Sequence, residues 1–233
     1  MKYKYNSIKK SLHPNESWFN VLILKYITLP LVYLIVNYTK ITPNGISLIS
    51  LVLGLASAYS YYKGSVLLGG ILYLLSYIFD AIDGKVARIT QKGKAYGSWL
   101  DIFIDRINLV LISTAIAYNY YQYTNDVSLI FLNSIFLGLV FIGSESRYNI
   151  NYYKLKNNTE NEIKKQKKSK YEEWCDKKGL IKSPISLPEL FLFYLIISPQ
   201  LKIEKYSIIV LIIFLIIRII AQQKFWFNVS KNK

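Results

Sequence analysis

The sequence has little cysteine and few acidic residues. Its single cysteine, Cys175, excludes a disulfide within the chain and leaves the redox environment open. Only 14 acidic residues stand against 29 basic ones, which gives a formal charge of +15. A soluble basic protein that binds nucleic acid would not contain several apolar runs of about 18–20 residues, the length that spans a bilayer. The composition therefore indicates a polytopic membrane protein, whose partner is the lipid bilayer and not nucleic acid.

The apolar runs predict one all-α membrane domain over residues 1–233, with a bundle of six transmembrane helices over 44–223. The spans are expected at about 44–62, 66–90, 97–118, 127–148, 186–201 and 206–223. The fifth is the weakest, because Pro188 and Pro199 bracket a short apolar core. No internal repeat and no signal peptide is evident, since a polar segment without a small-residue cleavage site precedes the first apolar stretch.

Two other segments are open to more than one interpretation. Residues 19–38 are apolar enough to span, but they contain Lys25 and Pro30. A juxtamembrane helix over 19–39, lying at the interface with its lysine reaching the headgroups, is preferred to a seventh span. Residues 149–185 are expected to form a cytoplasmic loop. Its lysine-rich part, 154–182, is either a solvated segment, or a lid or a contact for anionic lipid.

The distribution of lysine and arginine predicts the orientation of the chain. If the first span starts on the cytoplasmic side, 25 of the 29 basic residues fall in cytoplasmic segments and only three lie in outer loops. Cytoplasmic loops of membrane proteins carry such an excess. We therefore expect an integral protein of the cytoplasmic membrane, with both termini and its active site facing the cytoplasm.

Four aspartates interrupt the apolar stretches at helical spacing. In the second span Asp80, Asp83, Gly84, Ala87 and Arg88 stand at positions i, i+3, i+4, i+7 and i+8, so they share one face. Gly84 has no side chain and Ala87 adds little bulk, which leaves room for a nucleotide. Arg88 offers a planar guanidinium group that suits phosphate oxygens. The face therefore combines acidic ligands with a place for a phosphate.

A second acidic face follows in the third span. Gly97, Asp101 and Asp105 stand at i, i+4 and i+8, and the connection over 89–96 is so short that the two helices are antiparallel neighbours. Acidic groups at membrane depth are costly and usually mark an ion site, a substrate path or a proton relay. Two divalent cations, Mg²⁺ or Mn²⁺, would compensate the charge and clamp a phosphate. The predicted metal ligands are Asp80, Asp83, Asp101 and Asp105.

The pattern from Asp80 to Asp105 resembles the signature of the CDP-alcohol phosphotransferase family, with every defined position filled at the expected spacing. Thr42-Pro43-Asn44 is also similar to the element that opens the first span of that family, with Ser47 where a threonine often stands. The resemblance covers residues 19–125, and the later spans match only in being apolar. It implies a six-helix membrane fold behind an interfacial helix, usually as a homodimer, with a site open to the cytoplasm.

The resemblance also implies a reaction. A CDP-linked alcohol would bind as donor, and the hydroxyl of a second alcohol or lipid would attack the phosphate attached to the donor alcohol. A phosphodiester would form and CMP would leave, as in phospholipid or related head-group biosynthesis. Asp80, Asp83 and Asp101 would be shared metal ligands, with Asp105 near the second metal as the general base. The nucleotide and its diphosphate would be bound by Asn44, Asp83, Gly84, Ala87, Arg88 and Gly97.

The signature does not identify the two alcohols. Arg147 and Arg218 either bind a phosphate of the acceptor or act only as positive-inside anchors, and Glu145 could hold an amine instead. The donor is CDP-diacylglycerol or a CDP-linked head group. A divalent-cation transporter also needs intramembrane carboxylates, but not the spacing from Gly84 to Arg88. A non-catalytic scaffold would be expected to lack part of the aspartate set.

Overall fold

The computed structural model describes residues 3–10, 15–156, 169–183 and 186–231. Within these residues the regular secondary structure is helical, apart from one isolated bridge between Glu16 and Leu180. The first part contains α1 (Tyr5–Lys10), the π-helical turn η1 (Asn20–Leu24), α2 (Lys25–Tyr38), α3 (Pro43–Tyr62) and α4 (Val66–Thr90). The second part contains α5 (Ala95–Thr124), α6 (Ser128–Lys156), α8 (Lys170–Lys178), α9 (Leu187–Leu192), the π-helical turn η2 (Phe193–Ile197), α10 (Ser198–Leu201) and α11 (Glu204–Lys231).

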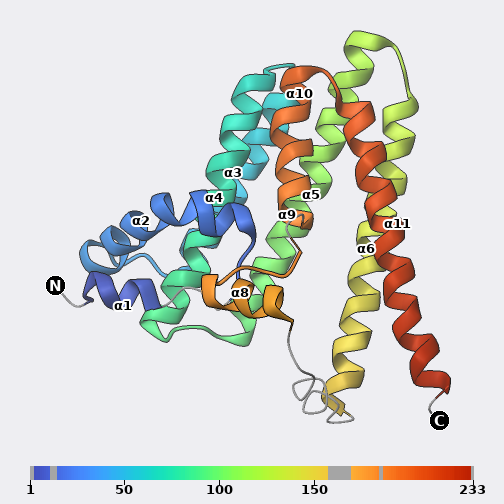
Figure 1. Cartoon of the computed structure of the whole chain (residues 1–233). Helices are drawn as coiled ribbons and strands as arrows, with labels where there is room; N and C mark the ends of the chain where they lie inside the picture. The colour runs from blue at the N-terminus through green and yellow to red at the C-terminus, as the bar shows by residue number, and fades with distance from the viewer. Residues whose placement is uncertain (1–2, 11–14, 157–168, 184–185, 232–233) are drawn as a thin grey trace.

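The long helices stand side by side, and the short N-terminal helices lie to one side of them (Figure 1). α3 packs against α4 and α5, while α6 packs against α11 and α5. The segment from α9 to α10 runs between these two groups, and η2 contacts α4, α5 and α11. α2 packs against α4 near the lower end of α3, and α8 lies below it, while α6 and α11 extend further down (Figure 1). The connection between α4 and α5 lies at this same end.

Helix termini near this end are defined by local chemistry. α3 starts at Pro43, whose missing N–H is not needed there, and the Thr42 side chain accepts a hydrogen bond from the Gly45 N–H at 3.2 Å. α4 ends where Gln91 takes a left-handed conformation with φ of 54°. These two termini place the start of α3 beside the last turns of α4, which carry the signature.

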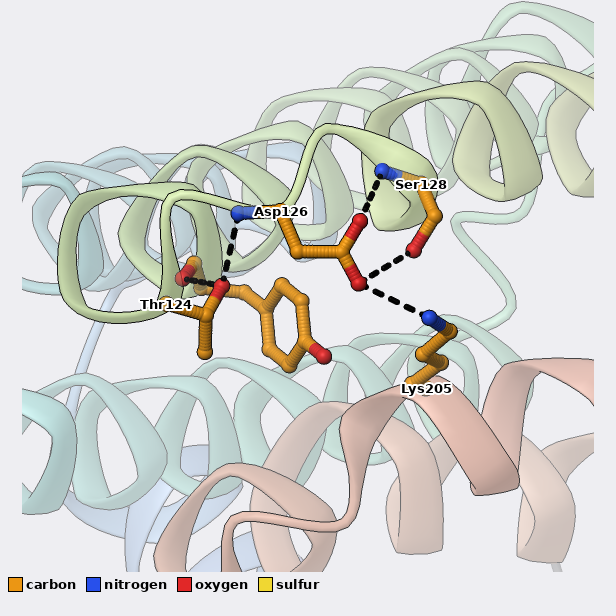
Figure 2. A network of polar contacts seen from close by, with 5 residues as sticks. Thr124, Asp126, Ser128 and Lys205 are labelled. Atoms are coloured by element: carbon orange, nitrogen blue, oxygen red, sulfur yellow. Dashed lines mark hydrogen bonds and ion pairs between the residues drawn. The ribbon is translucent and has the colours of Figure 1, made fainter.

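The opposite end is closed by a polar turn between α5 and α6 (Figure 2). The Asp126 carboxylate accepts hydrogen bonds from the backbone N–H and the hydroxyl of Ser128, both at 2.8 Å. It also accepts one from the Lys205 ammonium on α11 at 2.8 Å. The bond to the Lys205 ammonium, together with those from Ser128, lowers the pKa of Asp126 to about 2. The turn thus starts α6 and links it to α11.

Two apolar clusters hold the helices together. One packs the N-terminal helices against the signature-bearing half of α4, and the other fills the space between α5, α6, η2 and α11. Members of the first are Ile8, Leu24, Leu29, Val32, Ile46, Ile78, Ile82 and Val86. Because Ile78, Ile82 and Val86 occupy one face of α4, its aspartates are left to face α3 and α5.

Each of the six predicted spans coincides with a helix, or with the α9–η2–α10 series. Among the described residues, five helices are long and apolar enough to cross a membrane: Asn20–Tyr38, Pro43–Tyr62, Val66–Thr90, Ser128–Tyr153 and Glu204–Val229. α5, with its charged residues, and the shorter segment Leu187–Leu201 are not among them. The helix positions are therefore confirmed, while the count of six spans behind an interfacial helix stays a prediction.

The predicted loop over 149–185 differs in detail from the structure. α6 continues to Lys156, past the expected end at 148, and residues 170–178 form helix α8. Ser169 and Glu172 make a reciprocal capping box at the start of α8, and Gly179 ends it with φ of 70°. The structure describes only part of the lysine-rich stretch 154–182, because residues 157–168 lie outside the described residues. Its two interpretations, a solvated segment or a lid or lipid contact, therefore stay predictions.

Candidate active site

Three of the four signature aspartates form one cluster. Carboxylate oxygens of Asp80 and Asp83 on α4 and of Asp101 on α5 all lie within 4.8 Å of one another. Asp83 is buried, and the other two are half-buried. Such a set of hard oxygen donors fits Mg²⁺ or Mn²⁺, because like charges this close need a cation between them. The residues present therefore suit the predicted metal site.

The fourth aspartate stands apart from this cluster. Asp105 lies one turn beyond Asp101 on α5, is exposed, and lines a large cavity together with Asp80. Arg106, the next residue, donates a hydrogen bond from its guanidinium to the Ser144 hydroxyl at 2.6 Å and lies 5.6 Å from the Phe141 ring. The arginine is thus anchored to α6 beside the carboxylate of its neighbour.

A serine from α3 supports the buried ligand. The Ser47 hydroxyl donates a hydrogen bond to the Asp83 carboxylate, and it also lies 3.2 Å from the Pro43 carbonyl oxygen. The sequence pattern identifies Ser47 as a hydroxyl-bearing position but gives no partner for it. The contact exists because α3 begins beside the last turns of α4, so that Ser47 faces Asp83 across the two helices.

A small cavity of about 90 Å³ opens beside Asp83 and Asp101. Five of the six residues predicted to contact the nucleotide line it, namely Asn44, Asp83, Gly84, Ala87 and Gly97. Arg88, the sixth, is exposed next to it, with its guanidinium 3.5 Å from the point where Gly84 would carry a Cβ. A Cβ on Gly97 would lie 3.1 Å from the Asn44 side-chain oxygen, so the cavity has little space to spare.

The α4–α5 connection adds two lysines that the sequence analysis did not single out. Lys92 and Lys94 line the small cavity, with Gly93 between them. The signal was available, because both lysines stand in the short interval between Arg88 and Gly97. Two positively charged side chains therefore share the lining of the small cavity with Asp83 and Asp101.

A larger cavity of about 620 Å³ lies on the other side of the cluster. It is lined by residues of α4, α5, α6, α9 and α11, with both Asp80 and Asp105 in its wall. Its other polar lining residues are Tyr73, Tyr77, Arg106, Ser144, Arg147, Tyr148, Asn151 and Arg218. The rest of the lining is apolar and includes Leu109, Val140, Phe191 and Leu215. The cavity therefore combines three guanidinium groups with an apolar wall.

Two of the three predicted acceptor residues line the large cavity, and the third does not. Arg147 and Arg218, far apart in the sequence, line the same cavity as Asp105. Glu145 lines neither cavity; it is exposed and accepts a hydrogen bond from the Asn149 amide at 3.2 Å. Tyr73 and Tyr77 also line this cavity without being among the predicted site residues, although they stand seven and three residues before Asp80 and so share its helical face.

Most of the chain matches one family of known proteins. Residues 40–230 match the family described as CDP-alcohol phosphatidyltransferase. The chain belongs to this family, as its aspartate signature predicts. The match continues past residue 125, where the resemblance of the motifs ends, and takes in the last helices.

Individual relatives match over shorter stretches. The archaetidylinositol phosphate synthase of Pyrococcus horikoshii is 36% identical over 77 residues, which cover 33% of this chain and 41% of that protein. The bifunctional IPC transferase and DIPP synthase of Aquifex aeolicus is 40% identical over 67 residues, 29% of this chain and 15% of that protein. The matched segment is thus less than half the length of either relative.

A solved structure shares the fold. The phosphatidylinositol phosphate synthase of Mycobacterium tuberculosis, crystallised with CDP-DAG bound, gives a TM-score of 0.59 at 17% identity. The superposition covers 87% of this chain and 92% of that one. At this identity the likeness establishes the arrangement of helices and nothing further.

Proposed function

We propose that this chain is an integral-membrane CDP-alcohol phosphotransferase. It moves a substituted phosphate group from a CDP-linked alcohol to the hydroxyl of a second alcohol and releases CMP. The observation that carries the proposal is the position of the aspartate cluster between two cavities. Asp83 and Asp101 line the small cavity, while Asp80 and Asp105 line the large one. The donor nucleotide is assigned to the first and the acceptor to the second.

In the donor site the side chains leave space and supply charge. Gly84, Ala87 and Gly97 allow the nucleotide to approach the backbone, and the Asn44 amide offers polar contacts. Arg88 and the lysines of the α4–α5 connection face the negative diphosphate. Phosphoryl transfer depends chiefly on positioning and charge neutralisation, which these groups provide without a covalent enzyme intermediate.

Two divalent cations are the proposed cofactors. Asp80, Asp83 and Asp101 would be their shared ligands, with Asp105 near the second. When bound, Mg²⁺ or Mn²⁺ supplies Lewis acidity and offsets the charge that develops on the phosphate oxygens. The Ser47 hydrogen bond holds the carboxylate of Asp83 in one orientation, as outer partners of metal ligands generally do.

Asp105 is assigned as the general base. Its exposed carboxylate lies in the wall of the large cavity, where it can accept the proton of the acceptor hydroxyl. The hydroxyl oxygen then forms a bond to the phosphorus attached to the donor alcohol. The bond from that phosphorus to the oxygen of CMP breaks, and CMP leaves with its own phosphate.

The proposed acceptor is a small alcohol that carries a phosphate, such as an inositol phosphate, and the donor is a CDP-linked lipid. Three guanidinium groups, those of Arg106, Arg147 and Arg218, line the acceptor cavity and would offset the charge of such a phosphate. Two printed names agree with this choice, that of the archaetidylinositol phosphate synthase and that of the phosphatidylinositol phosphate synthase with the same fold. An amine acceptor held by Glu145 has less support, because that residue lies outside the cavity.

The test is CMP release by the purified protein. The protein is incubated with Mg²⁺ or Mn²⁺, with CDP-diacylglycerol or a CDP-linked head group, and with acceptors that differ only in the phosphate. We expect release with the lipid donor and the phosphorylated alcohol. No release with any pair, together with uptake of the cation into vesicles, would favour a divalent-cation transporter instead.

The arginines provide the test of the acceptor. Arg218→Ala should raise the KM for the phosphorylated alcohol about tenfold or more, since a charge-assisted contact to phosphate is lost. Arg147→Ala should act in the same direction, and donor binding should stay nearly unchanged. Lys224→Ala is the matched control, because this exposed residue lies on the same helix outside both cavities. Normal acceptor kinetics in both arginine variants would show that the two arginines act only as positive-inside anchors and do not bind the acceptor.

We also propose that the whole chain is one membrane domain whose active site and termini face the cytoplasm. Six helices span, from α3 to α11, and α2 lies at the interface. The support is the excess of basic residues in the segments assigned to the cytoplasm, and the orientation of α2 across the upright helices in Figure 1. Single cysteines placed in a Cys175→Ser background and labelled from each side test this. An N-terminus reached only from outside would make residues 20–38 a span.

The homodimer that the resemblance implies is tested by cross-linking in native membranes.

A further inference from the structure

A short segment ahead of α2 joins parts of the chain that are distant in sequence. In this segment, residues 16–20, the Glu16 N–H donates a hydrogen bond to the Gly179 carbonyl at 2.9 Å, and the Glu16 carbonyl accepts one from the Ile181 N–H at 3.0 Å. The Trp18 indole N–H donates to the Ile181 carbonyl at 3.2 Å. The segment is thus fastened to the connection that follows α8, and we call it the N-terminal clamp.

The same clamp holds the start of α9. The Phe19 N–H donates to one carboxylate oxygen of Glu189 at 3.2 Å. The other oxygen of Glu189 accepts a hydrogen bond from the Ser186 N–H at 3.1 Å, as part of the capping box of α9. Leu187 and Pro188, between these two residues, line the large cavity. One carboxylate therefore both starts α9 and ties this wall of the cavity to the clamp.

The clamp also reaches the opposite wall, on α4. The Tyr77 hydroxyl donates to the Asn20 side-chain oxygen at 2.9 Å, and the Tyr77 ring lines the cavity one turn before Asp80. Further along α4, the Lys85 ammonium lies 4.0 Å from the Glu16 carboxylate. The Lys85 side chain is only 3% exposed and that of Glu16 11%, so this charge pair is largely shielded from water.

We infer that the N-terminal clamp is a positioning element for the acceptor. It holds two walls of the large cavity, the Tyr77 side chain and the start of α9, in fixed places relative to Asp80. This inference rests on the proposed function. Residues 16–20 precede residue 40, where the family match begins, so the match itself assigns them no part in the site. A wall that is held in advance does not have to be ordered when the acceptor binds, which favours binding.

The experiment is a double-mutant cycle on the contact between Asn20 and Tyr77. Asn20→Ala and Tyr77→Phe each remove the same hydrogen bond, so each should raise the acceptor KM about three- to tenfold and leave donor binding unchanged. The double variant should be no worse than either single one, because the bond can be lost only once. Tyr59→Phe, an exposed tyrosine far along α3, is the matched control.

Hydrogen exchange of the same proteins provides a second measurement. The amides of Glu16, Phe19 and Ile181 should exchange slowly in the wild type and equally slowly in Tyr77→Phe, which separates a change in the cavity wall from loss of the clamp. Fast exchange of these amides in the wild type would overturn the inference. Unchanged acceptor KM in both single variants, or strictly additive effects in the double one, would overturn it as well. Absence of CMP release from the wild type is a different result, because it refutes the proposed function itself.

Discussion

Replacing Ser47 by alanine tests whether α3 orients a ligand of the metal site. The serine hydroxyl has one proton, and in this structure it is donated to the Asp83 carboxylate. Both side chains are only 5% exposed, so water cannot easily replace the lost donor. A hydrogen bond to a charged group contributes about 1.5–3 kcal/mol. Loss of such an outer partner of a metal ligand typically lowers metal affinity or activity by about 10- to 100-fold.

The assay compares two measurements of metal affinity in Ser47→Ala. One is the Mg²⁺ or Mn²⁺ concentration that gives half-maximal CMP release, and the other is binding of Mn²⁺ followed by electron paramagnetic resonance. Both the half-maximal metal concentration and the Mn²⁺ dissociation constant should rise by about 10- to 100-fold. Ser47→Thr keeps the hydroxyl and should remain close to the wild type.

Ser57→Ala provides the matched control on the same helix. The Ser57 hydroxyl is buried and donates to the Gly69 carbonyl at 2.7 Å, away from the aspartates. Its loss should cost stability without a change in metal affinity. If Ser47→Ala binds metal as tightly as Ser57→Ala does, the Ser47 hydroxyl does not orient Asp83 and the reasoning is refuted.

Three further predictions concern the reaction and the packing beneath it. Asp105→Asn should lose turnover while it retains donor binding better than Asp80→Asn, because the first variant loses mainly a base and the second loses a ligand of the shared metal site. Equal loss of donor binding in both variants, measured by isothermal titration, would make Asp105 chiefly a ligand. Excess chelator should abolish CMP release and added Mg²⁺ or Mn²⁺ should restore it, so full activity in chelator would contradict a metal-dependent mechanism. Gly54→Ala should lower the free energy of unfolding by about 1–3 kcal/mol, and with it the thermal unfolding midpoint in detergent. The reason is that its Cβ would lie 2.1 Å from the buried Asn108 side-chain oxygen. Gly138→Ala, whose new Cβ would meet no neighbouring side chain or helix within 4 Å, should be tolerated.

The sequence by itself was sufficient for the positions of the long apolar helices and for the faces that carry the signature. Helical periodicity relates residues three and four positions apart, so the shared face of Asp80 and Asp83 and that of Asp101 and Asp105 follow from spacing alone. The short connection between α4 and α5 then makes these faces neighbours, and the structure brings three of the four carboxylates within 4.8 Å. The family assignment follows from the same local pattern.

Only the tertiary structure decided which distant segments meet at the cavities. Arg147 and Arg218 share a wall with Asp105 because α6 and α11 pack against each other and α6 packs against α5, whereas Glu145, two residues from Arg147, faces away. Residues 16–20 reach α4 and α9 through hydrogen bonds between positions more than fifty residues apart along the chain. Spacing within one helix says nothing about such contacts, since they depend on how side chains of separate helices pack together.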